Sequence, residues 1–186
     1  MARVCREAGA RVSVNAFVRD LNIDAAPGDG RRLEVVANGL PLWGGAQIAV
    51  DTTLVSPVQR DGLPRPRAAE VDGVALKAAE LKKRTTYRDV VSSRRCRLVV
   101  MALEVGGRWS EEAIRFIQLL ARAKARSQPA ILRKAAEECY RRRWTGLVAM
   151  AAQRAFAASL LGGPLGGLAC VDGEAPPLGD VLAGAA

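Results

Sequence analysis

The sequence contains no histidine among its 186 residues. Without an imidazole the chain cannot form a Ser–His or Cys–His nucleophile pair, and it cannot build a metal site that uses histidine ligands. Any chemistry that the protein performs must therefore depend on carboxylate, lysine, arginine, tyrosine or cysteine side chains.

Closely spaced cysteines and long apolar segments are also missing. The four cysteines are far apart and form no Cys-x-x-Cys motif, so a zinc site is not expected. Scattered cysteines in a chain without a signal peptide indicate a reducing compartment and buried free thiols. The least charged segment, residues 155–171, contains four glycines and a proline, which argues against a membrane-spanning helix.

Positive charge is what the chain has in excess. Its formal net charge is +9, and 49% of its residues are apolar, which is enough for a globular domain with a sizeable core. Such an excess favours a polyanionic partner, most simply nucleic acid, and DNA in particular. The alternative is a soluble domain whose basic charge is incidental.

Local patterns predict four strands and four helical segments. The stretch "ARVCREAGA" is typical of a helix that ends at Gly9. Alternating or continuous apolar residues predict strands, and helix-forming composition with an N-terminal Ser110 cap or Pro129 predicts helices. The predicted strands are Arg11–Val18, residues 31–40, Gln47–Val55 and Cys96–Val105, and the predicted helices are Val74–Val91, Ser110 to about Ala125, and Pro129 to about Leu161, the last with a break near Gly146 left open.

This order predicts an α/β fold with a mixed central sheet of about four strands flanked by helices, in the order (α)βββαβαα. The first three strands form an antiparallel meander, and the fourth returns after a helix and pairs in parallel. The apolar run of the fourth strand is typical of a central buried strand. Residues 1–161 would form the domain, and residues 162–186, rich in glycine, alanine and proline, a flexible tail.

An aspartate in the middle of a predicted strand is the first candidate for chemistry. In "QIAVDTTLV" Asp51 lies between Val50 and Thr52, although aspartate is depleted in strands. Glu34 occupies a similar position in the preceding strand, and a hairpin would bring the two carboxylates together. Such a pair repels unless a cation lies between them, and its oxygens suit Mg²⁺ or Mn²⁺. The alternative is that both side chains point to solvent.

A lysine on an apolar helix stripe is the second candidate. Lys83 falls in a stripe with Leu76 and Tyr87, on a helix expected to lie across the two acidic strands. A lysine that faces a sheet needs a counter-charge, which Glu34 and Asp51 would supply; alternatively its ammonium reaches the edge of the sheet. Glu104, at the end of the fourth strand, is either a third carboxylate of the site or an ordinary strand-end charge.

Two carboxylates, a metal ion and a lysine form a known catalytic combination. The metal lowers the pKa of a bound water and neutralises a phosphodiester oxygen. The lysine positions or deprotonates that water, or stabilises developing charge. Phosphodiester hydrolysis by this route needs no histidine.

Basic and aromatic residues alternate in "YRRRW". Arg141, Arg142, Arg143 and Trp144 are the candidate nucleic-acid-binding residues. A solvated helix face has the same pattern, and Trp144 fits a place in the core or at the edge of a cleft better than a base-stacking surface.

The segments "RRLEVV", "AQIAVDTTLVSP", "ALKAAELKKRTTY" and "LVVMALEVGGRWSEEAIRFI" together resemble the restriction-like endonuclease of site-specific non-LTR retrotransposon polyproteins, within the PD-(D/E)XK superfamily. The resemblance covers residues 11–125. Glu34 and Asp51 match the two acidic positions, Lys83 and Tyr87 the "K…Y" of the helix, and Glu104 a further acid. "LE" replaces the proline–aspartate pair, and Thr53 stands where other members have the strand lysine.

This resemblance implies a Mg²⁺- or Mn²⁺-dependent DNA endonuclease domain within a larger reverse-transcriptase polyprotein, located in the nucleus. Glu34 and Asp51 would bind the metal, Lys83 would act at the water, Tyr87 would pack behind it or hydrogen-bond within the site, and Glu104 would be optional. Two alternatives remain: a non-catalytic nucleic-acid-binding module of the same fold, and an α/β protein-interaction domain.

Overall fold

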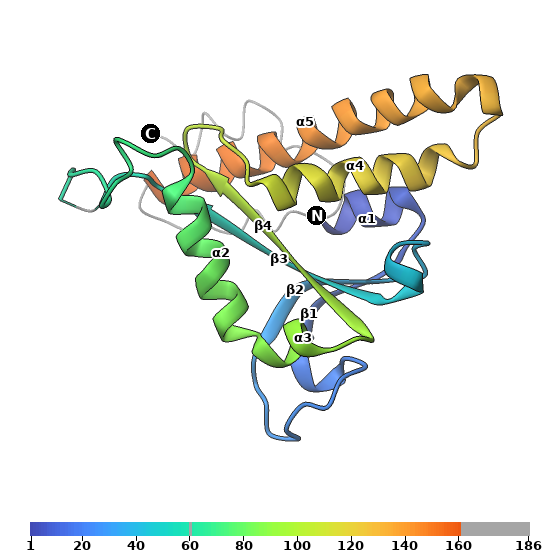
Figure 1. Ribbon diagram of the computed structural model, residues 1–186, viewed down its shortest axis with the longest axis horizontal. Coiled ribbons are helices and arrows are strands. Elements are labelled where there is room, and N and C mark those ends of the chain that lie inside the picture. The colour runs from blue at the N-terminus through green and yellow to red at the C-terminus, as the bar shows by residue number, and fades with distance from the viewer. Residues whose placement is uncertain (60, 161–186) are drawn as a thin grey trace, which may run out of the picture. The chain divides into compact units, whose positions relative to one another are not determined.

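The computed structural model describes residues 1–59 and 61–160 (Figure 1), so the predicted tail, residues 162–186, lies outside the described residues. Its elements are α1 (Ala2–Ala8), β1 (Arg11–Phe17), a 3₁₀ turn η1 (Val18–Asp20), β2 (Arg32–Asn38), η2 (Trp43–Gly45), β3 (Gln47–Val55), α2 (Val74–Thr86), α3 (Arg88–Ser92), β4 (Cys96–Glu104), α4 (Glu111–Ala125), η3 (Ala130–Leu132) and α5 (Arg133–Leu160).

The four strands form one mixed sheet in the order β1-β2-β3-β4 (Figure 1). β1 pairs with β2 and β2 with β3 in antiparallel fashion, whereas β3 and β4 are parallel and are joined through α2 and α3. The predicted α/β class, the antiparallel meander and the parallel return of the fourth strand are all confirmed.

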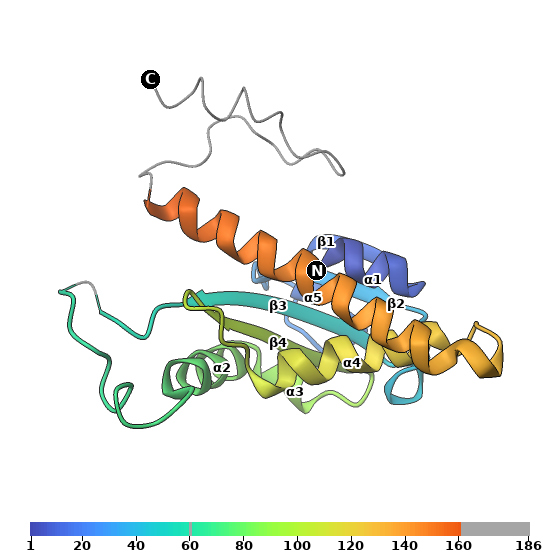
Figure 2. The same ribbon diagram turned by 90° about the horizontal axis from the view of Figure 1, so that it is seen from above.

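Helices cover both faces of the sheet (Figure 2). On one face, residues of α1, α4 and α5 such as Val4, Phe116 and Trp144 pack against alternate residues of the strands. On the other face, Leu76 of α2 and Val90 of α3 pack against the remaining ones. Both cores lie within a compact unit that spans Met1–Ala152.

The apolar fourth strand occupies a different place from the one that its composition predicts. β4 is an edge strand and not a central one, because it pairs with β3 alone. Its residues are nevertheless almost all buried, since helices cover both of its faces. The free edge is partly closed by Glu112 of α4, whose Oε2 accepts a hydrogen bond from the Val100 backbone N–H at 3.1 Å.

The last helix is continuous where the sequence left a break open. The 3₁₀ turn η3 precedes it, and α5 then passes through Gly146 without interruption. Trp144 and Val148, on either side of this glycine, are both buried in the same core. Their packing holds the backbone helical despite the low helix propensity of glycine.

The cysteines agree only in part with the prediction of buried thiols. Cys5 and Cys96 are buried free thiols, and burial raises the pKa of each to about 11, which keeps them unreactive. Cys139 is a free thiol that lies exposed on α5. Among the described helices none is both long and apolar enough to cross a membrane.

A carboxylate of α1 ties the first helix to the last. Glu7 accepts hydrogen bonds from Arg143 at 2.9 and 3.0 Å and from the Trp144 indole N–H at 2.8 Å. The hydrogen bond from Arg143 is the largest cause that lowers the pKa of Glu7 to about 2; burial acts in the opposite direction.

We expect Glu7→Gln to lower the stability of the protein at neutral pH. Because the folded-state pKa of Glu7, about 2, lies below the ordinary 4.5, its contribution is full above pH 4.5 and is lost as the pH falls through 2. The difference between wild type and Glu7→Gln in urea unfolding should therefore shrink over that range. Glu138→Gln is the matched control: Glu138 also has a pKa of about 2, but it lies at the surface, where solvent screens its pairs with Arg141 and Arg142.

Candidate active site

The two predicted acidic residues lie on adjacent strands where the pairing of β2 and β3 ends, Asp51 buried and Glu34 exposed. The antiparallel ladder runs through Val35–Val50, and in the same register Glu34 and Asp51 would be the next pair. Instead of a further backbone pair, the Glu34 carboxylate accepts hydrogen bonds from the Thr52 backbone N–H at 3.2 Å and from the Thr52 hydroxyl. The sheet therefore opens beside Asp51.

Asp51 is a buried carboxylate that forms an ion pair with a lysine. The residue is 2% exposed, and its Oδ2 lies 2.8 Å from the Nζ of Lys83. The contact is an ion pair at hydrogen-bonding distance, and no other donor among the described residues reaches Oδ2. The aspartate in the middle of the strand is thus balanced by the lysine that the helix stripe predicts.

The position of α2 explains how Lys83 reaches the sheet. Leu76 is buried, and Lys83 follows it by two helical turns on the same face. The helix packs over β3 and β4, and not over β2 and β3 as predicted, because it returns the chain from the end of β3 to the start of β4. Asp51, on β3, is therefore within its reach.

Lys83 is held in its charged form. Burial opposes the charge, but the hydrogen-bonding contact with Asp51, together with the negative charges of Asp51 and Glu34, raises the pKa of Lys83 above its ordinary value. The side chain is 30% exposed, so Lys83 keeps some contact with solvent. At neutral pH Lys83 is a cation that donates hydrogen bonds and not a base.

Tyr87 follows Lys83 by one helical turn, but its hydroxyl already forms a hydrogen bond outside the ion pair. It is 7% exposed, and its hydroxyl donates to the backbone carbonyl of Arg32 at 2.7 Å. Burial, followed by the charge of Asp51, raises the pKa of the phenol. Tyr87 is thus a neutral side chain that joins the end of α2 to β2, and its role here is to position the site.

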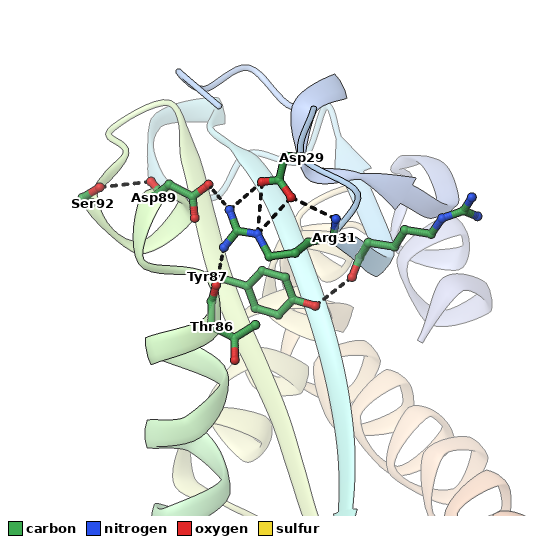
Figure 3. A network of polar contacts seen from close by, with 7 residues as sticks. Asp29, Arg31, Thr86, Tyr87, Asp89 and Ser92 are labelled. Atoms are coloured by element: carbon green, nitrogen blue, oxygen red, sulfur yellow. Dashed lines mark hydrogen bonds and ion pairs between the residues drawn. The ribbon is translucent and has the colours of Figure 1, made fainter. Parts of the chain in front are cut away.

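The predicted helix Val74–Val91 is divided in two at Tyr87, and Arg31 contacts both helices at this break (Figure 3). Arg31 donates from Nη1 to the carbonyl of Thr86, from Nη2 to Asp89 at 2.6 Å, and from Nε and Nη2 to Asp29. A guanidinium that binds the terminal carbonyl satisfies one of the groups left free at a helix end. The loop before β2 therefore sets the end of α2.

Replacing Arg31 with alanine is expected to lower the melting temperature by several degrees, since Asp89 already carries a buried oxygen without a hydrogen bond. Arg31→Lys should recover only part of this lost stability. The ammonium of lysine lacks the planar fork of donors with which a guanidinium binds several acceptors at once. Arg94→Ala is the control, since Arg94 is exposed and forms no ion pair with any described residue. Equal melting temperatures for Arg31→Ala and Arg94→Ala would contradict the assignment.

The structure does not bring Glu104 to the other carboxylates. Asp51 pairs in register with Val100, and Glu104 lies four residues further along β4, which at about 3.3 Å per residue is roughly 13 Å away. Its side chain lies 3.8 Å from Arg108 and is largely buried. Glu104 is thus an ordinary charged residue at the end of a strand, which was the alternative to a third carboxylate of the site.

Glu80 is a carboxylate that the sequence interpretation left out. Its Oε1 is buried, and no hydrogen-bond partner for it is present among residues 1–59 and 61–160. Glu80 follows Leu76 by four residues and precedes Lys83 by three, so it belongs to the same stripe of α2. That spacing was the available signal, and it places a further acidic group on the helix that carries Lys83.

The "RRRW" cluster lies on α5, where carboxylates already pair with its arginines. Arg141 and Arg142 contact Glu138 at 2.7 and 2.6 Å, and Arg143 contacts Glu7. Trp144 is fully buried, as the core alternative expects, and therefore offers no surface for base stacking. Of the four residues, Arg142 is the most accessible, with 77% of its side chain exposed.

The donor set at the opening of the sheet suits a hard divalent cation with few protein ligands. No group of three acidic or cysteine side chains in the described part of the chain forms a metal site. Mg²⁺, however, is commonly bound through one or two carboxylates and keeps several waters. The buried Asp51 carboxylate, which no donor other than Lys83 reaches in the described structure, and the Glu34 carboxylate on the adjacent strand fit that requirement.

Comparison with known proteins yields no family model that matches this chain. No curated protein matches it significantly either. The functional argument therefore depends on the geometry of Glu34, Asp51, Lys83 and Tyr87.

Proposed function

We propose that the chain is a metal-dependent endonuclease domain of the restriction-like type, which hydrolyses phosphodiester bonds in DNA. The observation that carries the proposal is the buried Asp51 carboxylate, paired with Lys83 at 2.8 Å where the β2–β3 ladder ends beside Glu34. The burial of Asp51 costs hydration, and titratable groups in such perturbed environments cluster at functional sites.

Each residue has a distinct role in this proposal. Asp51 and Glu34 hold Mg²⁺ or Mn²⁺, which when bound lowers the pKa of a water and neutralises a phosphate oxygen. Lys83 orients the attacking water or stabilises charge on the phosphate, and its raised pKa favours these roles over that of a general base. Tyr87 keeps the end of α2 against β2, so that Lys83 stays beside Asp51.

The resemblance supports a wider proposal about origin: a domain that derives from a non-LTR retrotransposon, belongs to a larger reverse-transcriptase polyprotein, and meets its DNA in the nucleus. The net charge of +9 favours such a polyanionic substrate. Arg142, with its exposed guanidinium, and its neighbours Arg141 and Arg143 are proposed to contact phosphates of the duplex.

Incubation of supercoiled plasmid with the purified protein tests the proposal. Nicked circles should accumulate with Mg²⁺ or Mn²⁺, and excess chelator should prevent them. The substitution Asp51→Asn controls for contaminating nucleases, since a contaminant would cut equally in both preparations. Absence of nicking with both metals, by a protein that still binds the plasmid, would reject catalysis.

A non-catalytic nucleic-acid-binding module is the second candidate, and one observation favours it. Lys83 already neutralises Asp51, and no third acidic group completes a metal site within the described residues. This module would bind nucleic acid equally well with chelator and would cut nothing. A protein-interaction domain, in contrast, would not bind nucleic acid even at low salt.

Duplex binding should weaken steeply with salt, because counterion release dominates phosphate contacts. Arg142→Ala should reduce the slope of log K against log salt by about one, the value for a single phosphate contact. Arg142→Lys keeps the charge and should leave the slope unchanged. Fluorescence anisotropy with a labelled duplex measures all three proteins, and identical slopes would remove Arg142 from the interface.

A further inference from the structure

A pocket of about 280 Å³ opens at the free edge of β4, apart from the Asp51–Lys83 pair. Four elements contribute to its wall: η2, β4, α4 and the second half of α2. The side chains that matter for its chemistry are Trp43, Arg84, Arg97, Glu112, Arg115 and Phe116.

Trp43 presents an exposed aromatic ring to this pocket. The residue is 39% exposed, which is high for so large an apolar side chain. Its φ of +47° lies in the left-handed region, a costly conformation for a bulky residue, and one that clusters at functional sites. The ring stacks on Phe116 with centroids 6.1 Å apart and planes inclined by 17°. An aromatic surface is therefore held in place at the mouth of the pocket.

Two of the arginines that line the pocket have no acidic partner in the described part of the chain. Arg84 is neutralised by Glu112, whose oxygens it contacts at 2.8 Å. The Arg97 guanidinium lies over the Trp43 ring, 5.7 Å from its centre, in a cation–π contact, and neither Arg97 nor Arg115 forms an ion pair with any described residue. Guanidiniums without a carboxylate partner, beside an aromatic ring, are the groups that bind a phosphate and a base together.

We propose that this pocket binds one nucleotide of a single-stranded nucleic acid, with the base on Trp43 and the phosphate on Arg97 and Arg115. Aromatic stacking with guanidinium contacts is the usual mode for single strands, whereas a duplex conceals the faces of its bases. Glu111, on the rim, offers an acceptor to a base amino group or a sugar hydroxyl. The site needs no metal, so it does not depend on whether Asp51 supports cleavage.

The pocket and the Asp51–Lys83 pair lie on two sides of the same helix. Lys83 points to Asp51, and the next residue, Arg84, points to Glu112 at the β4 edge. A strand held in the pocket would therefore pass beside α2, a few residues from the candidate active site.

Tryptophan fluorescence in the presence of chelator tests this site in the full chain. A short oligothymidylate should quench the emission of the wild type at low salt, because a base stacks on the exposed Trp43. Trp43→Phe should lose the quenching because the reporting indole is gone, and Trp43→Ala should bind about tenfold more weakly by anisotropy because no ring is left for the base. Arg97→Ala and Arg115→Ala should each weaken binding by a similar factor, whereas Arg126→Ala, which removes the same charge at the end of α4 outside the pocket, should change it less than about twofold.

Three results would overturn the proposal. Unchanged fluorescence at saturating oligonucleotide would remove Trp43 from the site. If Arg115→Ala and Arg126→Ala lost equal oligonucleotide affinity, the binding would depend on net positive charge and not on the pocket. Tighter binding of free thymidine monophosphate than of the oligonucleotide would exclude a strand and assign the pocket to a free nucleotide. Circular dichroism of each variant shows that a loss of binding is not a loss of folding.

Discussion

Asp51→Asn is expected to reduce metal-dependent DNA cleavage by roughly a thousandfold. The substitution removes the buried charge that would hold the metal, and the several kcal/mol of transition-state stabilisation that a metal supplies correspond to a rate loss of that order. Plasmid nicking at saturating Mn²⁺, with calorimetry of Mn²⁺ binding on the same preparations, measures both effects. Metal affinity should fall together with the rate.

The fold should survive this substitution. Asparagine has nearly the same shape as aspartate, and Lys83, which is 30% exposed, can turn its ammonium to solvent when its partner is neutral. Glu104→Gln is the matched control, since it neutralises another largely buried carboxylate that lies away from the pair. Glu104→Gln should cut DNA like the wild type. Cleavage that falls for Glu104→Gln but not for Asp51→Asn would reverse the assignment of the site.

Lys83→Met should destabilise the protein strongly, by about 3 kcal/mol in the absence of metal. It leaves Asp51, 2% exposed, as a buried charge without a partner. The value lies at the low end of the range for buried pairs because Lys83 keeps some contact with water. For a chain of this length, the melting temperature should fall by about 10 °C. Lys82→Met, on an exposed neighbour, should change it little.

Metal should reverse part of this loss. Mn²⁺ bound at Asp51 supplies the missing counter-charge, so its addition should raise the melting temperature of Lys83→Met more than that of the wild type. The variant should also bind Mn²⁺ at least as tightly as the wild type, since the lysine no longer competes for Asp51 Oδ2, and yet should not cleave DNA. A Lys83→Met variant that is as stable as the wild type and does not respond to Mn²⁺ would mean that Asp51 and Lys83 are neither a buried ion pair nor part of a metal site.

Local sequence patterns determined most of the sheet and part of the site. Period-two alternation and turn residues define β1, β2 and β3 as a meander, because each is a property of neighbouring residues. The same kind of argument placed Asp51 inside a strand and Lys83 on the inner stripe of α2. Their contact at 2.8 Å follows because β4 returns parallel to β3, so that the crossover helix α2 between them must pack back onto these strands.

The tertiary structure alone decided which charges meet and which surfaces stay open. Arg143 and Trp144 contact Glu7, 136 and 137 residues away, and no periodicity encodes a contact at such a separation. An apolar run shows that β4 is buried, but whether strands or helices bury it depends on the packing of α2 and α4. Likewise, the pocket beside Trp43 arises only where η2, β4, α2 and α4 come together, because a cavity is a property of packed elements and not of any one segment.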